Sequence, residues 1–277
     1  MVNVRTFKKI LQRTQSELKE IVSNYLIKKD YKVTEGDGFV YGEGDIPILL
    51  VAHLDIVHQQ PPQKIYFDAE ELVMWSPTGI GGDDRCGVYA LMRLISKDYK
   101  PHVLFLEDEE VGCKGAHKCV KALEKPNVKF MIEIDRRGSD DCVFYDCDNK
   151  DFKEYIESFG FKTAWGSYTD ICVLSKNWDI ASVNLSSGYF NEHTEKEFIN
   201  LNYLVRTLKR VVNILEDTDD RYFDYQPVVY KSYPLSNYKQ QNIYNTDELD
   251  DYPINLDGCS YYKYGWYDKE HNWHWYN

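Results

Sequence analysis

A continuous apolar run that leads into a histidine and an aspartate constrains the fold of this chain most strongly. Residues Ile48 to Val57 read Ile-Leu-Leu-Val-Ala-His-Leu-Asp-Ile-Val, so five apolar residues precede His53 and Asp55. Such a run, entered through Gly44 and Pro47, predicts a strand buried on both faces, as in a mainly parallel sheet. Ligands of open α/β sheets bind at the carboxyl ends of the strands, so we expect a site at His53.

Asp55 follows His53 by two residues, so the two side chains point to the same side of extended backbone. A carboxylate beside an imidazole fixes its tautomer and raises its basicity, an arrangement common at zinc sites. A His-x-Asp sequence by itself also fits an ordinary pair of surface residues. The rest of the chain decides between these interpretations.

Acidic residues follow two further apolar runs. Residues 102–106 lead into Glu107-Asp-Glu-Glu110, and residues 130–134, interrupted only by Glu133, lead into Asp135. Acidic runs on a surface usually stay solvated, but four consecutive acids at the end of a buried strand favour a bound cation. Three strand ends that supply histidine and acidic side chains therefore predict a metal site.

Two aspartates stand where a glycine-rich turn meets a predicted helix. The sequence Thr78-Gly-Ile-Gly-Gly-Asp-Asp84 contains three glycines, which let the backbone turn tightly. Apolar periodicity from Val88 to Ile95 then predicts a helix. Capping of the helix N-terminus explains one aspartate. It does not explain a bend that exposes Asp83 and Asp84 in succession.

The remaining pattern alternates strands with amphipathic helices. We expect helices at 6–29, 151–159 and 200–215, strands at 31–33, 39–41 and 180–185, and a hairpin at 65–75. His193 falls in the loop between the last strand and the last helix. This alternation predicts an α/β fold, a three-layer α/β/α sandwich with a mainly parallel central sheet, plus an aromatic-rich C-terminal appendage.

The composition excludes several classes of protein. The 277 residues are 43% hydrophobic and 28% charged, as in ordinary globular proteins, and no apolar run is long enough to span a membrane. The net charge of −12 disfavours a nucleic-acid partner. The N-terminus lacks the apolar core of a signal peptide, so we expect a cytoplasmic protein without a membrane partner. Its seven cysteines, without a Cys-x-x-Cys pair, predict free thiols.

Five motifs in order resemble the di-zinc exopeptidase superfamily of metallopeptidases. The resemblance covers about residues 48 to 201. Each motif alone is weak, whereas all five in the right order are specific. The motifs are His53-Leu-Asp55, Gly82-Asp-Asp-Arg85, Asp108-Glu-Glu-Val-Gly112, Asp135 after a strand, and Gly188-Tyr-Phe-Asn-Glu-His-Thr194.

The resemblance implies a role for each of these residues. Asp55 is expected to orient His53, and Glu109 is expected to act as the general base. The Asp83-Asp84 peptide bond is expected to be cis. Two Zn²⁺ ions, or Co²⁺ or Mn²⁺ in their place, would be bound by five ligands, and the resemblance implies that Asp83 bridges the two ions. The ligands are His53, Asp83, Glu110, Asp135 and His193.

The resemblance also implies a hydrolase of peptide or related amide bonds. The leading hypothesis is an exopeptidase that cleaves small peptides. It would be an aminopeptidase, a carboxypeptidase or a dipeptidase. A deacylase or amidohydrolase acting on an N-acyl amino acid is the first alternative, and a non-catalytic binding protein that kept the fold is the second. The sequence leaves the substrate, the recognised terminus, the metal and the oligomeric state open.

Two gaps in the motif pattern are short. Only 29 residues separate His53 from Asp83, and 57 separate Asp135 from His193. Neither gap can hold the lid or dimerisation domain that relatives insert, so we expect a site that is open to solvent or covered by another part of the chain.

The composition changes after residue 215, which divides the chain into a catalytic domain at 1–215 and an extension at 216–277. The extension contains 12 Asp or Glu, 5 Lys or Arg, and 16 of the 41 aromatic residues. Disordered tails contain few aromatics, so this is not a plain acidic tail. The extension has three possible roles: it docks onto the catalytic domain, covers the site or binds a partner. The first is favoured.

Two interpretations of Arg136 and Arg137 stay open. Their guanidinium groups have the shape to grip a substrate carboxylate. Pairing with Asp140 or Asp141, a few residues further on, is equally compatible with the sequence.

Overall fold

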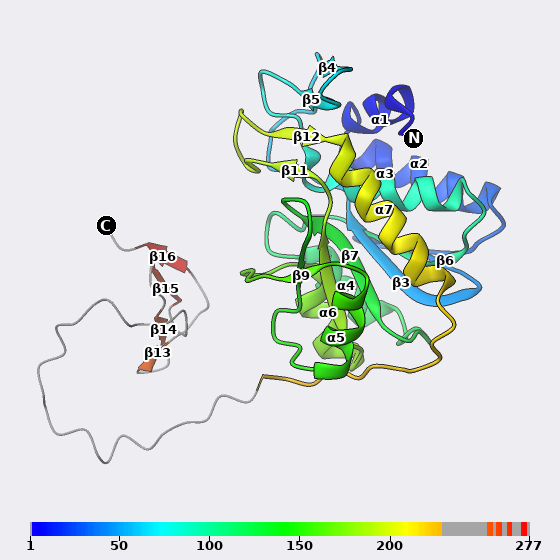
Figure 1. Cartoon of the computed structure of the whole chain (residues 1–277), viewed down its shortest axis with the longest axis vertical. Helices are drawn as coiled ribbons and strands as arrows, with labels where there is room; N and C mark the ends of the chain where they lie inside the picture. Colours follow the sequence, from blue (N-terminus) through cyan, green and yellow to red (C-terminus); the bar gives the residue numbers. More distant parts are fainter. Residues whose placement is uncertain (1, 229–253, 257–258, 262–264, 268–272, 276–277) are drawn as a thin grey trace, which may run out of the picture. The chain divides into compact units, whose positions relative to one another are not determined.

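The computed structural model describes residues 2–228 and four short strands near the C-terminus, at 254–256, 259–261, 265–267 and 273–275 (Figure 1). The chain divides into two compact units, Met1–Val229 and Tyr230–Asn277. No helix among the described residues is long and apolar enough to cross a membrane. The six cysteines of the first unit are free thiols.

An eight-stranded sheet forms the centre of the first unit. Its four middle strands, in the order β6, β3, β7 and β10, are parallel, whereas β2 and β8 join them antiparallel. The strands are β1 (Lys32–Gly36), β2 (Phe39–Glu43), β3 (Ile46–His53), β6 (Pro101–Leu106), β7 (Met131–Arg136), β8 (Asp141–Val143), β9 (Lys162–Thr163) and β10 (Ser182–Ser186).

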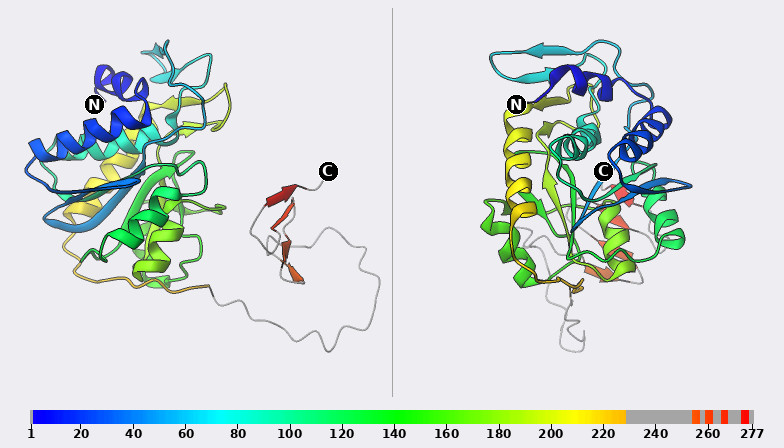
Figure 2. Two further views of the ribbon diagram at one scale, coloured as in Figure 1. Left: turned by 180° about the vertical axis from the view of Figure 1, so that it is seen from behind. Right: turned by 90° about the vertical axis from the view of Figure 1, so that its right-hand side faces the viewer.

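Helices cover both faces of this sheet, and Figure 2 shows α3 and α7 on one side with α4 and α6 on the other. Alternate residues of β3 enter different cores: Leu50 packs with α3 and α7, whereas Leu49 and Val51 pack with α4 and α6. Burial on both faces explains the continuous apolar run and confirms the predicted sandwich. The helices are α1 (Val4–Leu11), α2 (Gln15–Lys28), α3 (Gly82–Ile95), α4 (Lys114–Ala122), α5 (Lys150–Ser158), α6 (Asp170–Trp178) and α7 (Leu201–Glu216).

A second, smaller sheet lies beside α3. It is antiparallel, in the order β11, β12, β5 and β4, and it contains the predicted hairpin. Its strands are β4 (Tyr66–Asp68), β5 (Val73–Trp75), β11 (Tyr189–Phe190) and β12 (Phe198–Asn200). The loop that carries His193 joins β11 to β12, so this sheet fixes both ends of that loop.

The prediction of one helix over 6–29 is wrong, because two helices, α1 and α2, occupy this stretch. The second begins with a capping box: Thr14 accepts the backbone N–H of Glu17 at 3.3 Å, and the Glu17 carboxylate accepts the N–H of Thr14 at 2.9 Å. The Thr-x-x-Glu sequence is the signal for this break. Apolar periodicity alone continued across it.

The first compact unit extends beyond the composition change at residue 215. Phe223 is 4% exposed, and its ring lies 5.2 Å from that of Phe152 and 6.0 Å from that of Phe130. Ala181, next to β10, donates its N–H to the carbonyl of Phe223 at 2.9 Å. Residues 217–228 are therefore anchored to this unit by apolar burial and by backbone hydrogen bonds.

The second unit contains one small antiparallel sheet of β13 (Ile254–Leu256), β14 (Cys259–Tyr261), β15 (Gly265–Tyr267) and β16 (Trp273–Trp275). The prediction that residues 216–277 dock, cover the site or bind a partner concerns segments that lie mostly outside the described residues. It stays a prediction.

Candidate metal centre

The parallel strands bring the predicted residues to one edge of the central sheet. His53 is the last residue of β3, Asp135 lies near the end of β7, and Glu109 and Glu110 follow β6. Because these three strands are neighbours and parallel, their carboxyl ends meet. Asp83, at the start of α3, lies against His53.

Asp83 stands between two histidines. Its Oδ1 lies 3.2 Å from His53 Nε2, and its Oδ2 lies 3.3 Å from His193 Nε2. On the first side, His53 Nε2 also lies 3.6 Å from Asp135 Oδ1. On the second, His193 Nε2 lies 3.1 Å from Glu110 Oε2. The five predicted ligands thus form two half-sites, each with one histidine and one further carboxylate, around Asp83.

This donor set fits zinc. Ligand atoms of His53, Asp83 and Glu110 all lie within 4.8 Å of one another. A tetrahedral site with bonds of about 2.0–2.1 Å separates its ligand atoms by about 3.3 Å, close to the His–carboxylate distances above. Oε1 of Glu110 is buried and has no hydrogen-bond partner among the described residues. A cation would satisfy this oxygen.

Local backbone geometry presents Asp83. Gly81 has φ +66°, and a Cβ there would meet Ile56 Cγ2 at 2.9 Å, so only glycine fits this left-handed position without strain. The Asp83-Asp84 peptide bond is cis, as predicted. The carboxylate of Asp84 binds backbone N–H groups instead. Its Oδ1 accepts the N–H of Gly87 at 2.8 Å, and its Oδ2 accepts the N–H of His53 at 3.3 Å.

Asp55 has a wider role than the predicted one. Oδ1 accepts a hydrogen bond from His53 Nδ1 at 3.1 Å, so Nε2 faces the half-site. Asp55 also accepts the backbone N–H groups of Glu109 and Glu110, at 3.1 and 3.0 Å. One half-buried carboxylate therefore contacts a histidine and also holds the loop that carries both glutamates.

Three residues make supporting hydrogen bonds that the sequence did not predict; of these, Tyr189 belongs to the fifth motif. The hydroxyl of Tyr189 donates to Asp135, at 3.0 Å to its carbonyl and 3.2 Å to Oδ1. Asn184 accepts the N–H of Asp135 at 2.9 Å. Thr169 donates to Glu133 at 2.8 Å beneath them. Glu133, inside a strand buried on both faces, was the available signal, because a buried carboxyl group needs hydrogen-bond partners.

Glu197 was not predicted as a site residue either, although it lies only four residues after His193. It is 1% exposed, and its carboxylate accepts the backbone N–H groups of Gly81 at 2.7 Å and Asp83 at 3.0 Å. His58 Nε2 lies 3.5 Å from the same carboxylate. No local sequence pattern pairs Glu197 with the glycine-rich turn.

The electrostatics of the centre indicate a deficit of positive charge. Burial raises the pKa of Glu109 to about 7. Hydrogen bonds to Asp83 and Glu110 raise the pKa of His193 to about 11. Burial opposes a charge on His53, but the neighbouring carboxylates raise its pKa well above the usual value. In the metal-free protein, protonated histidines supply the positive charge that cations would bring.

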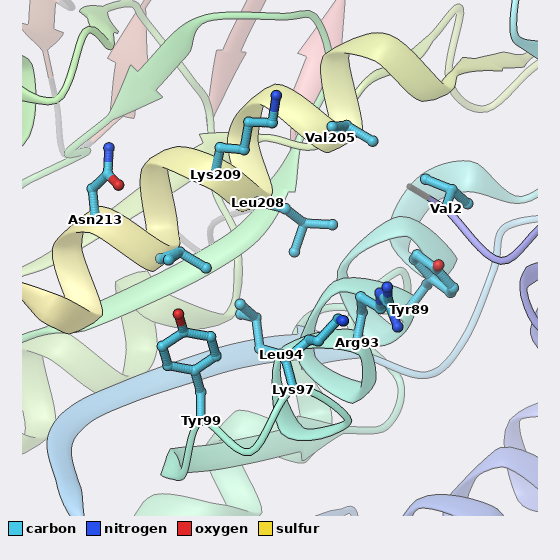
Figure 3. A pocket seen from close by; sticks show the side chains of 11 residues that line it. Val2, Tyr89, Arg93, Leu94, Lys97, Tyr99, Val205, Leu208, Lys209 and Asn213 are labelled. Carbon is cyan, nitrogen blue, oxygen red and sulfur yellow. The ribbon is translucent and has the colours of Figure 1, made fainter.

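A separate hollow of about 450 Å³ lies between α3 and α7 (Figure 3). Leu94 of α3 and Leu208 of α7 face each other across it, and Lys97 and Lys209 also line it. The described side chains around it include no acid and no histidine. It therefore offers no metal ligands, and the chemistry of the chain is concentrated at the sheet edge.

No protein-family model and no curated protein matches the sequence. Among solved structures, the chain has the fold of zinc-dependent exopeptidases and aminopeptidases, which confirms the predicted fold. It is similar to aminopeptidase PepT from Bacillus cereus, at 15% identity over 77% of this chain and 97% of that chain, with a TM-score of 0.64.

Two further structures extend this likeness. A tripeptidase from Staphylococcus aureus is 14% identical over 77% of this chain and 96% of that chain, with a TM-score of 0.63. A Zn-dependent exopeptidase from Parabacteroides distasonis is 17% identical over 76% of this chain and 94% of that chain, with a TM-score of 0.55.

Proposed function

We propose that this protein is a zinc-dependent exopeptidase that binds two metal ions through His53, Asp83, Glu110, Asp135 and His193. The observation that carries the proposal is the position of Asp83, whose two oxygens face different histidines at 3.2 and 3.3 Å. A carboxylate between two histidine–carboxylate pairs suits a bridge between two cations. The similar structures are those of peptidases, which supports the reaction class.

A pair of zinc ions, held by these five residues, would supply two effects that an amide needs at neutral pH: a water of lowered pKa and a polarised carbonyl. Imidazole and carboxylate ligands also accept Co²⁺ or Mn²⁺. The remaining chemistry belongs to the chain. It must hold the scissile amide at the cleft, which has a volume of about 120 Å³ and is lined by Asp83, Glu109, Asp135 and His193 among others.

Glu109 is the proposed general base. It lies next to Glu110 and lines the cleft, and its backbone is held by Asp55 at 3.1 Å. Burial raises its pKa to about 7, which suits a group that takes a proton from water and returns it to the leaving nitrogen. Asp55 is the proposed orienting residue of His53.

Zinc analysis and a substrate panel test this proposal. The purified chain should bind two zinc ions, lose activity with a chelator and regain it with zinc. The panel should contain aminoacyl anilides, di- and tripeptides and N-acyl amino acids, since the deacylase is the alternative. Zinc bound without hydrolysis of any amide would contradict the enzyme and favour a binding protein. The cytoplasmic location and the lack of nucleic-acid and membrane partners stay predictions.

A further inference from the structure

The cleft at the candidate centre has a positive wall. Acids and His193 line one part of it, whereas Arg136 and Arg137 line another, together with Tyr145, Tyr168 and Glu192. The chain carries a net charge of −12, so two adjacent arginines beside an acidic centre are not a general feature of its surface. They are positioned by β7, directly after Asp135.

Arg137 is already engaged. Its Nη1 donates to Glu192 Oε1 at 2.6 Å, which neutralises the acid nearest to His193 in sequence. Neither Asp140 nor Asp141 is its partner; Asp140 instead pairs with Arg206 and Arg210, both at 2.7 Å. Because Glu192 is in this ion pair, it is not available to bind a substrate ammonium group.

Arg136 has one hydrogen bond and one long ion pair, to a half-exposed acid. Its Nη2 donates to the carbonyl of Trp165 at 3.0 Å, a neutral partner that fixes the guanidinium group. Asp141 lies 3.9 Å from Nε, beyond hydrogen-bond distance, and the buried Nε has no hydrogen-bond partner among the described residues. The hydrogen bonds described for this part of the chain do not use its Nη1. The guanidinium group therefore retains hydrogen-bond donors for a second carboxylate, although Asp141 offsets part of its charge.

We propose that Arg136 binds the α-carboxylate of the substrate, so that the bond cleaved is the last one before a free C-terminus. This inference rests on the proposed function. Asp135 and Arg136 both line this cleft. A substrate carboxylate bound by Arg136 would therefore lie in the same cleft as the scissile carbonyl. The substrate class is dipeptides, other short peptides cleaved at the C-terminal residue, or N-acyl amino acids.

Matched substrate pairs test this proposal on the zinc-loaded protein. A peptide with a free C-terminus is compared with the same peptide carrying a C-terminal carboxamide. We expect kcat/KM to fall about 10- to 100-fold for the carboxamide, the value of a charged hydrogen bond. Equal kcat/KM for both members of a pair would overturn the role of Arg136 while leaving the peptidase itself intact.

Variants assign the effect to Arg136. In Arg136→Gln the ratio between the two substrates should approach one, and Arg136→Lys should recover part of it because the charge returns. Arg5→Gln, on the exposed side of α1, is the matched control and should keep the wild-type ratio. An unchanged ratio in Arg136→Gln would overturn the assignment.

A binding measurement separates this proposal from the proposed function. Calorimetry on the metal-free protein compares N-acetyl-leucine with N-acetyl-leucinamide, because a carboxylate also binds zinc. We expect the acid to bind more tightly in the wild type and the difference to vanish in Arg136→Gln. If the zinc-loaded protein hydrolyses no amide, the peptidase proposal fails, whereas this difference still decides the role of Arg136. Equal binding of both compounds to the wild type would overturn it.

Discussion

The carboxylate of Glu197 accepts the backbone N–H of Asp83 at 3.0 Å, although 114 positions separate the two residues in the chain. Its other oxygen accepts the N–H of Gly81 at 2.7 Å. Because Glu197 lies on the same loop as His193, one buried side chain connects that loop to the turn that presents Asp83. Glu197 thereby holds the loop of His193 close to Asp83.

Replacing Glu197 should loosen the centre without removing a ligand. Glu197→Ala leaves two buried N–H groups without acceptors, and we expect a loss of about 2–5 kcal/mol in the free energy of unfolding. Zinc affinity should also fall, because Asp83 is no longer held. Urea unfolding and a zinc competition titration measure the two effects. Glu195→Gln, exposed on the same loop, is the control, and an unchanged zinc affinity in Glu197→Ala would argue against the positioning role.

Glu109→Gln should separate chemistry from metal binding. The amide cannot accept a proton, so we expect kcat to fall about 10²- to 10⁴-fold while zinc content stays at the wild-type level. Asp83→Ala should lose both zinc and activity, since both half-sites use this carboxylate. Metal analysis and steady-state kinetics on the same samples test this pair. Full turnover in Glu109→Gln with zinc retained would remove Glu109 from its assigned role.

Zinc binding should release protons. The pKa of His193 is raised to about 11 by its hydrogen bonds to Asp83 and Glu110, above the value near 6.5 of an unfolded histidine. Its stabilising effect on the metal-free protein is therefore complete below about pH 6.5 and is lost as the pH rises toward about 11.

Coordination requires a neutral imidazole, so zinc affinity should rise with pH over the same range. Calorimetric zinc titrations in buffers of different ionisation enthalpy count the protons released. We expect about one proton from His193 and one from His53 at neutral pH. His117→Gln, an exposed site on α4, should leave this number unchanged. Identical heats in all buffers would contradict the expectation.

Phe223 tests where the first unit ends. Its ring is buried against Phe130, Phe152 and Tyr155, so Phe223→Ala should lower the free energy of unfolding by about 3–5 kcal/mol. The neighbouring Tyr222 is 56% exposed, and Tyr222→Ala should change it by less than about 0.5 kcal/mol. Similar unfolding curves for the two variants would mean that residues beyond 215 add little to the unit.

Local pattern was sufficient for the central elements. The apolar run before His53 predicted β3 because a strand covered on both faces has no polar side to show. The tight turn before α3 was predictable from its three glycines, but the contact with Ile56 that excludes a side chain at Gly81 appears only in the tertiary structure. The break before α2 also had a local signal, the capping box of Thr14 and Glu17. The prediction of a single helix followed the apolar periodicity and did not use this signal.

The sequence by itself determined which residue types stand at the strand ends, and therefore the fold and the candidate ligands. Only the tertiary structure decided which oxygen of Asp83 faces which histidine, and that Glu197 and Asp55 hold the turn and the loop around them. The physical reason is that strand and helix periods are local, whereas a carboxylate can accept a backbone N–H from any segment that packing brings within 3 Å of it.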